Sequence, residues 1–169
     1  ISDRLYFTLF VKFRKSDKKL KAGEYLLSAS KTPEQILDVL LQGKVKLYKI
    51  TIPEGKNIKE VAHIVETAGF CRKKKFTDLC HDRSFILSLG LKSTMLEGYL
   101  FPDTYFFPRH ASCEDIISAM VRHFKKAMTP TWEIRANTLG FSIHDIVTLA
   151  SIIEKETGDA KERPLISSV

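Results

Sequence analysis

Two glutamates lie in the final turn of a predicted helix near the end of this 169-residue chain: Glu154 and Glu156, in the segment ASIIEKETG (150–158). The C-terminal end of a helix carries partial negative charge, and neighbouring carboxylates repel each other. Both effects favour the protonated carboxyl that a general acid needs. Helical spacing puts Glu156 one turn beyond Ile152 and Ile153, so we expect it in the slightly more apolar position. The residues alone do not decide between the two glutamates as the general acid. The alternative is that both belong to a solvated surface patch at a helix end.

A second segment, LEGYLFPDTYFFP (96–108), combines carboxylates with aromatic side chains. Aromatic faces stack on sugar C–H groups and carboxylates accept hydrogen bonds from hydroxyls, so Glu97, Tyr99, Asp103 and Tyr105 are candidate carbohydrate-binding residues. The two prolines argue against a helix or a central strand, and we expect a hairpin or an ordered loop. The alternative is that these aromatics only pack in a core.

The elements that must position these residues begin with strand–helix–strand–helix units over residues 22–69. A short strand is expected over 24–27. Thr32 and Pro33 are typical of a helix start, and Gly43 of its end. Alternation over 46–52 predicts a strand, followed by a turn at 53–55. A helix then begins after Asn57, with Glu60 three residues on, and ends at Gly69.

The rest of the chain reads as mostly helical. We expect helical pieces over 72–92, a helix over 114–128 and another over 131–139. The last helix begins at Ser142, with Asp145 three residues on, and ends at Thr157 before Gly158. The tail of a further helix is predicted over residues 3–14.

Charge is unevenly distributed along the chain. The net charge is +7; residues 1–49 hold 11 Lys or Arg against 5 Asp or Glu, whereas residues 50–169 hold 16 against 15. The basic field therefore belongs to the first module and favours an anionic partner. The basic run 72–75 lacks the aromatic interleaving or fold of a nucleic-acid site, so we expect a solvated face and no nucleic-acid partner.

Three cysteines are present, and an odd count excludes a fully paired disulfide framework in a monomer. The spacing of Cys71, Cys80 and His81 matches no strong zinc pattern, so no metal site is expected. Phosphate-binding glycine loops and nucleophile elbows are absent from the sequence, and we expect no cofactor. Neither a bilayer-spanning apolar run nor a signal peptide occurs, and the chain begins at Ile1; we expect any membrane anchor to lie upstream.

Two long motifs carry a resemblance to a known family. LEGYLFPDTY (96–105) resembles the E-G-[YW]-[LF]-[FW]-P-D-T-[YW] signature of the YceG-like family, the membrane-anchored endolytic murein transglycosylases. ASIIEKET (150–157) resembles their A-S-[IV]-[IV]-E-K-E-T signature, and ERP (162–164) fits the residues that come after it in the family. Upstream, AGEY (22–25) and IPEG (52–55) are similar to the family's small LysM-like module and its junction with the catalytic domain. The resemblance covers nearly the whole chain.

The resemblance implies an α+β fold: a partial LysM-like module at 1–50, then a mostly helical α+β catalytic domain at 51–169. It also implies cleavage of the β-1,4 bond between N-acetylmuramic acid and N-acetylglucosamine inside glycan strands, leaving 1,6-anhydro-muramyl ends. Glu156 matches the catalytic residue, with Glu154 as the fallback. Glu97 and Asp103 would then hold or orient sugar.

Further expectations concern the setting of the protein. The family's catalytic domain runs on past these motifs, so we expect a domain truncated at its C-terminal end, which leaves the activity of this portion open. The resemblance implies a single-pass protein of the bacterial inner membrane, with this portion facing the periplasm or cell wall. The resemblance also implies peptidoglycan glycan strands, and possible peptidoglycan synthases, as its partners.

Two rival functions stay open on the sequence. A non-catalytic peptidoglycan-binding module would bind glycan without releasing product. Aminodeoxychorismate lyase is a name attached to this family, but that activity belongs to a pyridoxal-phosphate fold. The sequence has no sign of a phosphate-binding cup around a Schiff-base lysine.

Overall fold

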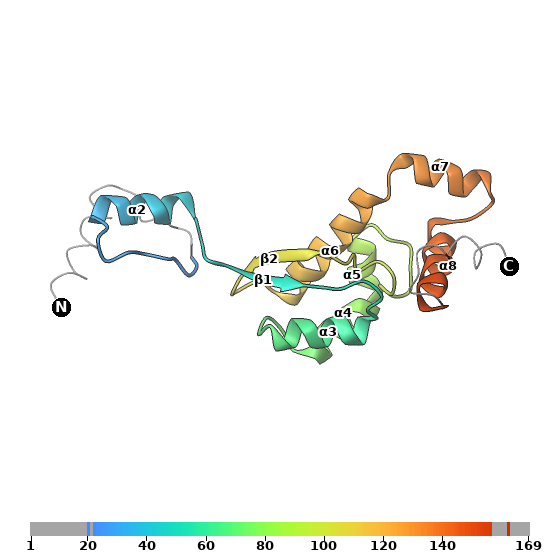
Figure 1. The fold of residues 1–169 in the computed structure, drawn as a ribbon, viewed down its shortest axis with the longest axis horizontal. Coiled ribbons are helices and arrows are strands. Elements are labelled where there is room, and N and C mark those ends of the chain that lie inside the picture. The colour runs from blue at the N-terminus through green and yellow to red at the C-terminus, as the bar shows by residue number, and fades with distance from the viewer. Residues whose placement is uncertain (1–19, 21, 157–161, 163–169) are drawn as a thin grey trace. The chain divides into compact units, whose positions relative to one another are not determined.

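The computed structural model describes residues 20, 22–156 and 162, in which seven helices and a two-stranded sheet form a mixed α/β fold (Figure 1). The chain divides into two compact units. Unit 1 contains residues up to 49 together with 106–110, and unit 2 contains 50–105 and 111–169. Whether unit 1 is LysM-like stays a prediction. The helix tail predicted over 3–14 and the stop predicted at 157–158 lie outside the described residues.

The helix of unit 1 follows its sequence signals. Helix α2 (Pro33–Gln42) is capped by Thr32, whose side chain accepts from the Gln35 N–H, and it ends at Gly43 with φ 67°. That prediction is confirmed. The strand expected over 24–27 is wrong: this segment is irregular, and the Glu24 carbonyl accepts one bond from the Lys46 N–H at 2.7 Å. A strand needs a continuous ladder of such bonds.

The sheet pairs two segments that are far apart in sequence. Strand β1 (Leu47–Thr51), predicted from its alternation, pairs with β2 (Thr104–Pro108). The Thr51 and Thr104 hydroxyls lie 3.0 Å apart. The segment 96–108 is therefore an ordered loop over 96–103 followed by a strand, and a hairpin within it is wrong because β2 finds its partner in β1. Pro108 is tolerated at the last position of a strand at a sheet edge.

Four helices build the core of unit 2: α3 (Ile58–Thr67), α4 (Lys73–His81), α5 (Arg83–Ser88) and α6 (Cys113–Ala127). Helices α3 and α6 begin with reciprocal capping boxes, at Asn57 and Ser112. Most of the largest fully buried side chains belong to these helices: Val61, Val65, Phe76, Ile86, Ile116, Ile117, Met120 and Val121. Leu96 joins them from the loop 96–103. The predicted turn at 53–55 and the helices predicted over 57–69, 72–92 and 114–128 are confirmed.

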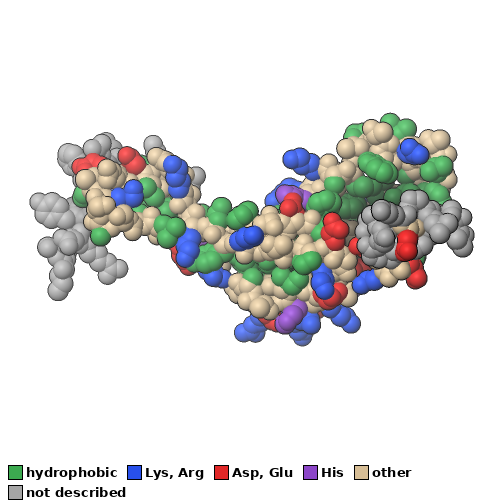
Figure 2. All heavy atoms as spheres, viewed as in Figure 1, with side chains coloured by type: hydrophobic (Ala, Val, Ile, Leu, Met, Phe, Trp, Pro, Cys, Tyr) green, Lys and Arg blue, Asp and Glu red, His purple; other side chains and the backbone are tan. Residues whose placement is uncertain are grey.

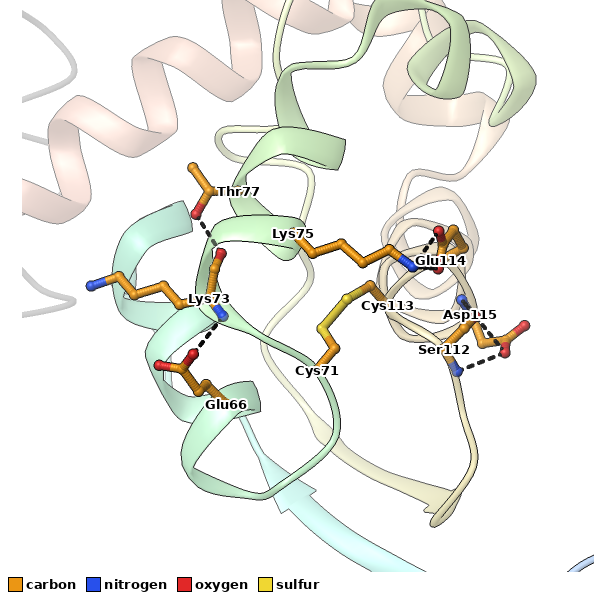
Figure 3. The surroundings of a disulfide bond; sticks show 9 residues. All are labelled: Glu66, Cys71, Lys73, Lys75, Thr77, Ser112, Cys113, Glu114 and Asp115. Atoms are coloured by element: carbon orange, nitrogen blue, oxygen red, sulfur yellow. Dashed lines mark hydrogen bonds and ion pairs between the residues drawn. A yellow bond between two sulfur atoms is a disulfide. The ribbon is translucent and has the colours of Figure 1, made fainter.

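A disulfide joins the loop after α3 to the first residue of α6 (Figure 3). It links Cys71 to Cys113 across a sequence separation of 42. An ion pair between Lys75 and Glu114, 2.9 Å apart, lies beside it. Cys80 is the cysteine left over; it is buried and free. Burial raises the pKa of its thiol to about 12, with a smaller contribution from the charge of Glu97.

The last two helices are α7 (Pro130–Thr138) and α8 (Ile143–Glu156), both where the sequence predicts them. Hydrophobic side chains lie at the surface over α7, with Trp132 56% and Ile134 68% exposed (Figure 2). Among the described residues no single helix is long and apolar enough to span a membrane. Helices α7 and α8 taken together are long and apolar enough for a span, by length and composition only, and the pair is bent by 92°.

Candidate active site

One face of α8 lies against the two loops that carry the other sequence motifs. The side chains that make these contacts are His144, Val147, Ser151 and the pair Glu154–Lys155. Their spacing of three, four and three to four residues keeps them on one side of an α-helix. The helix therefore presents a single stripe to the loop 96–99 and to the turn 53–55.

The first contact joins Tyr99 to the first turn of α8. The Tyr99 hydroxyl lies 3.0 Å from His144 Nδ1, and the two rings are parallel with centroids 6.2 Å apart. The Tyr99 ring also makes an edge contact with Phe124 of α6 at 5.0 Å. Only 4% of Tyr99 is exposed, and burial raises the pKa of its hydroxyl. Tyr99 thus supports the loop from within, and its ring has no open face for a sugar.

The second contact is a close approach at Gly98. The residue has φ +82°, and an ideal Cβ built on it would lie 2.4 Å from Val147 Cγ1 and 3.3 Å from Ser151 Oγ. A side chain at this position would both strain the backbone and overlap α8. The EGY motif therefore contains its glycine because the middle of α8 touches the loop backbone there.

The third contact joins the last turn of α8 to the turn of the IPEG motif. The Lys155 Nζ donates to the Gly55 carbonyl at 3.3 Å. Gly55 has φ +70°, and Glu154 Oε1 would lie 3.9 Å from a Cβ built on it. The carboxylate of Glu154 consequently lies over this turn. Three motif segments, 53–55, 96–99 and 150–156, thus meet along α8.

The N-terminus of α3 adds electrostatics to this junction. Glu97 Oε2 accepts from the Ile58 N–H, at the first residue of α3, at 3.3 Å. A carboxylate is favoured there by the free N–H groups and the helix dipole. Glu60 in the same turn forms an ion pair with Lys56 at 2.7 Å. The pKa of Glu60 is lowered, first by this bond with Lys56, then by the Asn57 N–H, and to a smaller extent by the charge of Lys155.

The two candidate acids face different surroundings. Glu154 is half-buried beside the turn 53–55, whereas Glu156 is exposed. Residues two apart in a helix point about 200° from each other, so Glu156 lies on the opposite side of α8. The expectation that Glu156 is the more apolar position is wrong, because the burying neighbour comes from a distant turn and not from α8 itself. Which glutamate is catalytic stays a prediction.

The remaining predicted residues gather around a histidine of α6. Asp103 Oδ2 lies 3.0 Å from His123 Nδ1, and Asp103 Oδ1 accepts from the Thr104 N–H at 2.6 Å. The Thr104 N–H first, and then His123, lower the pKa of Asp103. Tyr105 is 4% exposed, donates to the Phe101 carbonyl at 2.7 Å, and packs its ring 5.0 Å from that of His123. Asp103 is exposed and can contact a ligand, whereas Tyr105 is held in the interior.

Sequence reasoning missed several residues of this junction. His144 and Ser151 could have been found, because they lie ten and three residues before Glu154 and so share its side of the helix. Gly55 lies in the IPEG motif, but neither Gly55 nor His123 carries a signal for its partner, since the partners come from other segments. Within the described part of the chain, no group of three or more His, Cys, Asp or Glu side chains could hold a metal ion.

Comparison with known proteins gives consistent matches. Residues 1–169 match the model of the YceG-like family. The chain is 30% identical to the endolytic murein transglycosylase of Streptococcus pneumoniae strain D39, over 98% of this chain and 34% of that protein. It is also 30% identical to the endolytic murein transglycosylase of Bacillus subtilis strain 168, over 96% of this chain and 49% of that protein.

A solved structure matches as well. The crystal structure of a YceG-like protein from Listeria monocytogenes is similar with a TM-score of 0.60 and 29% identity, over 94% of this chain and 57% of that one. The chain spans 34% and 49% of the length of the two curated relatives, about a third to a half.

Proposed function

The chain belongs to the YceG-like family, and on this premise we propose that it is part of a peptidoglycan lytic transglycosylase that cuts within glycan strands. The observation that supports this proposal is the meeting of three motif segments along α8, with Glu154 and Glu156 at its end. Curated relatives that bear the name endolytic murein transglycosylase match over nearly the whole chain.

One carboxyl suffices for the proposed reaction. The acid, Glu156, protonates the oxygen of the β-1,4 bond between N-acetylmuramic acid and N-acetylglucosamine. The bond from muramyl C1 to that oxygen breaks, N-acetylglucosamine leaves with a free 4-hydroxyl, and an oxocarbenium-like centre forms at C1. The same group, now a base, takes the proton of the muramyl 6-hydroxyl, which attacks C1 and closes the 1,6-anhydro ring. Ordinary glycosidases need a second carboxylate to act as nucleophile or to activate water. Here the internal hydroxyl replaces water.

The other site residues take supporting roles in this proposal. Glu97 and Asp103 are exposed carboxylates that can accept hydrogen bonds from sugar hydroxyls. Tyr99 and Tyr105 are buried, so we assign them to holding the loop 96–103 in place and no longer to stacking on sugar. Glu154 is the alternative acid, and its position over the turn 53–55 is what recommends it.

The proposed setting is outside the cytoplasm, at the cell wall, with an inner-membrane anchor upstream and peptidoglycan synthases as partners. The disulfide between Cys71 and Cys113 supports an oxidising compartment, because disulfides rarely persist in the reducing cytosol. Peptidoglycan is assembled in that compartment outside the cytoplasm.

The test is product analysis by mass spectrometry after incubation of the longest natural form of the protein with purified sacculi. We expect anhydro-muramyl ends from the parental protein and a loss of about 100-fold or more in Glu156→Gln, which keeps the size of the side chain but cannot transfer a proton. Glu154→Gln is the paired variant. Glu133→Gln on α7, an exposed glutamate away from the junction, is the matched control.

The outcomes separate the two glutamates from each other and from the rival function. Loss in Glu154→Gln alone would move the acid to Glu154. Unchanged product release in both variants would refute a role for this helix end in the chemistry. The rival function is that of a non-catalytic peptidoglycan-binding module. It predicts co-sedimentation with sacculi and no anhydro ends from the parental protein.

A further inference from the structure

We propose that Lys155 is a positioning residue that fixes the acid-bearing end of α8 against the turn 53–55. The inference rests on the proposed function, since it concerns how the acid is aimed. Lys155 stands between Glu154 and Glu156 in the sequence. It does not touch the reacting atoms in this proposal; it acts through the backbone that carries both glutamates.

The contact that supports the proposal spans the chain. The Lys155 ammonium donates to the Gly55 carbonyl at 3.3 Å across a separation of 100 residues. The same charge contributes to the lowered pKa of Glu60, so it also lies close to the first turn of α3. The ammonium therefore joins the C-terminal turn of α8 to the turn that precedes α3, with its charge near the first turn of that helix.

The last turn of α8 needs a contact that holds it in place. The last turn of a helix has carbonyls without intrahelical partners and frays readily. A side chain on such a turn is aimed well only if the turn itself is held. The earlier turns of α8 are fixed by Tyr99 on His144 and by Gly98 on Val147. Lys155 is the residue that extends this fixation to the turn that carries Glu154 and Glu156.

The turn at Gly55 is suited to accept a hydrogen bond from the Lys155 ammonium. A backbone with φ +70° turns the chain sharply between β1 and α3, and the Gly55 carbonyl is the acceptor that it presents to α8. Glu154 lies over the same residue at ordinary contact distance. The family motifs IPEG and EKE are thus complementary halves of one contact.

The energetics give this role a distinctive signature. An exposed hydrogen bond from an ammonium adds little to global stability, because water competes for both partners. Misplacing a catalytic group by about 1 Å can nevertheless cost on the order of 100-fold in rate. Loss of Lys155 should therefore lower kcat strongly while the melting temperature scarcely moves.

The experiment compares Lys155→Met, which keeps an unbranched apolar stem but lacks the ammonium, with Lys155→Arg, which keeps a donor. Lys126→Met is the matched control, because Lys126 is an exposed lysine in the last turn of α6. For Lys155→Met we expect a fall in kcat of about 10- to 100-fold, with KM within about 2-fold of the parental value. Lys155→Arg should recover most of the loss, and Lys126→Met should match the parental protein. All Tm shifts should stay below about 4 °C.

Hydrogen–deuterium exchange supplies a measurement that does not depend on activity. Exchange at the amides of residues 152–156 should speed up in Lys155→Met and return toward the parental rate in Lys155→Arg. A parental kcat in Lys155→Met overturns the proposal, as does a loss that Arg does not recover. If the parental protein makes no anhydro ends, the proposed function fails, and exchange alone decides: unchanged protection in Lys155→Met overturns the tether, and faster exchange supports it.

Discussion

At the residue scale, Gly98 shows how one position can serve both backbone and packing. Its φ of +82° favours glycine, and its Cα approaches α8 so closely that a methyl group would lie 2.4 Å from Val147 Cγ1. Gly140, between α7 and α8, has a similar φ of +77° but open space around it. Substitutions at the two glycines therefore distinguish the effect of backbone strain from the effect of overlap with α8.

We expect Gly98→Ala to destabilise the protein by about 1–3 kcal/mol more than Gly140→Ala, because only the first adds overlap to strain. If the proposed function holds, the same variant should also reduce release of anhydro ends, since α8 must shift to make room. Urea denaturation of both variants measures the difference. Equal losses of unfolding free energy would show that α8 does not press on this loop.

Cys80 gives a prediction for alkaline pH. Its folded-state pKa of about 12 lies above the ordinary value of 9.0 because the thiol is buried. The folded state thus holds the thiol proton more tightly than the unfolded state does. The resulting stability is fully present below pH 9 and is lost as pH rises toward 12.

Between pH 9 and 10 the free energy of unfolding should fall with a slope of up to about 1.4 kcal/mol per pH unit from this group. Cys80→Ala should be less stable overall but show a flatter slope in the same interval. Urea midpoints at several pH values measure both. A slope unchanged by Cys80→Ala would exclude the thiol as its origin; Tyr105→Phe serves as the control for the tyrosine whose burial also raises its pKa.

The candidate site was only partly predictable at this scale. The motif glutamates, Tyr99 and Asp103 stand out by type and spacing, and the structure places Tyr99 and Glu154 in one junction. The sequence could not say which side of α8 would be buried, because the contacts of Glu154 come from Gly55, about 100 residues away in sequence. It also could not separate aromatic rings that stack on a ligand from rings such as Tyr105 that fill the interior.

At the element scale, local signals were reliable where they satisfied backbone groups. The predicted capping residues Thr32, Asn57 and Ser142 each mark the true start of a helix. Those signals work because they supply partners to free N–H groups within three residues. The strand predicted over 24–27 failed, and the partner of β2 was missed, because strand pairing is decided by residues distant in sequence.

The N-terminal cap of α8 matters for the candidate site because it stabilises the helix that carries Glu154 and Glu156. The Ser142 Oγ accepts from the Asp145 N–H at 3.2 Å, and Asp145 Oδ2 accepts from the Ser142 N–H at 2.9 Å. We expect Ser142→Ala to cost about 1 kcal/mol of unfolding free energy, and Ser142→Asn, another good cap, to cost less than half of that. Urea denaturation compares the two. A similar loss in both would mean that the hydroxyl does not act as the cap.

At the scale of the whole molecule, the disulfide is the feature with the largest predicted effect on stability. Closing a loop of 42 residues is worth about 4 kcal/mol in the chain-entropy model. Cys71→Ser with Cys113→Ser should therefore lower the free energy of unfolding by roughly that amount, within the usual range of about 2–5 kcal/mol. Cys80→Ala, which leaves the bond intact, is the control for loss of a cysteine.

Thiol titration checks the pairing itself. The native protein should show no reactive thiol, because Cys71 and Cys113 are bonded and Cys80 is buried. Unfolding without reductant should expose one thiol, that of Cys80. Three reactive thiols on unfolding without reductant would contradict the bond, since the chain contains three cysteines.

The disulfide also closes a covalent ring, residues 71–113, that contains α4, α5, the loop 96–103 and β2. A protease that cuts one peptide bond inside this ring leaves a single covalent molecule, with the loop of Glu97 and Tyr99 still attached at both ends. Helix α8 lies outside the ring, so one cut between 113 and 143 leaves this helix without a covalent link to the loop it contacts. The two halves of the junction thus differ in their exposure to proteolysis, and the chain can lose Glu154 and Glu156 while keeping the loop that α8 lies against.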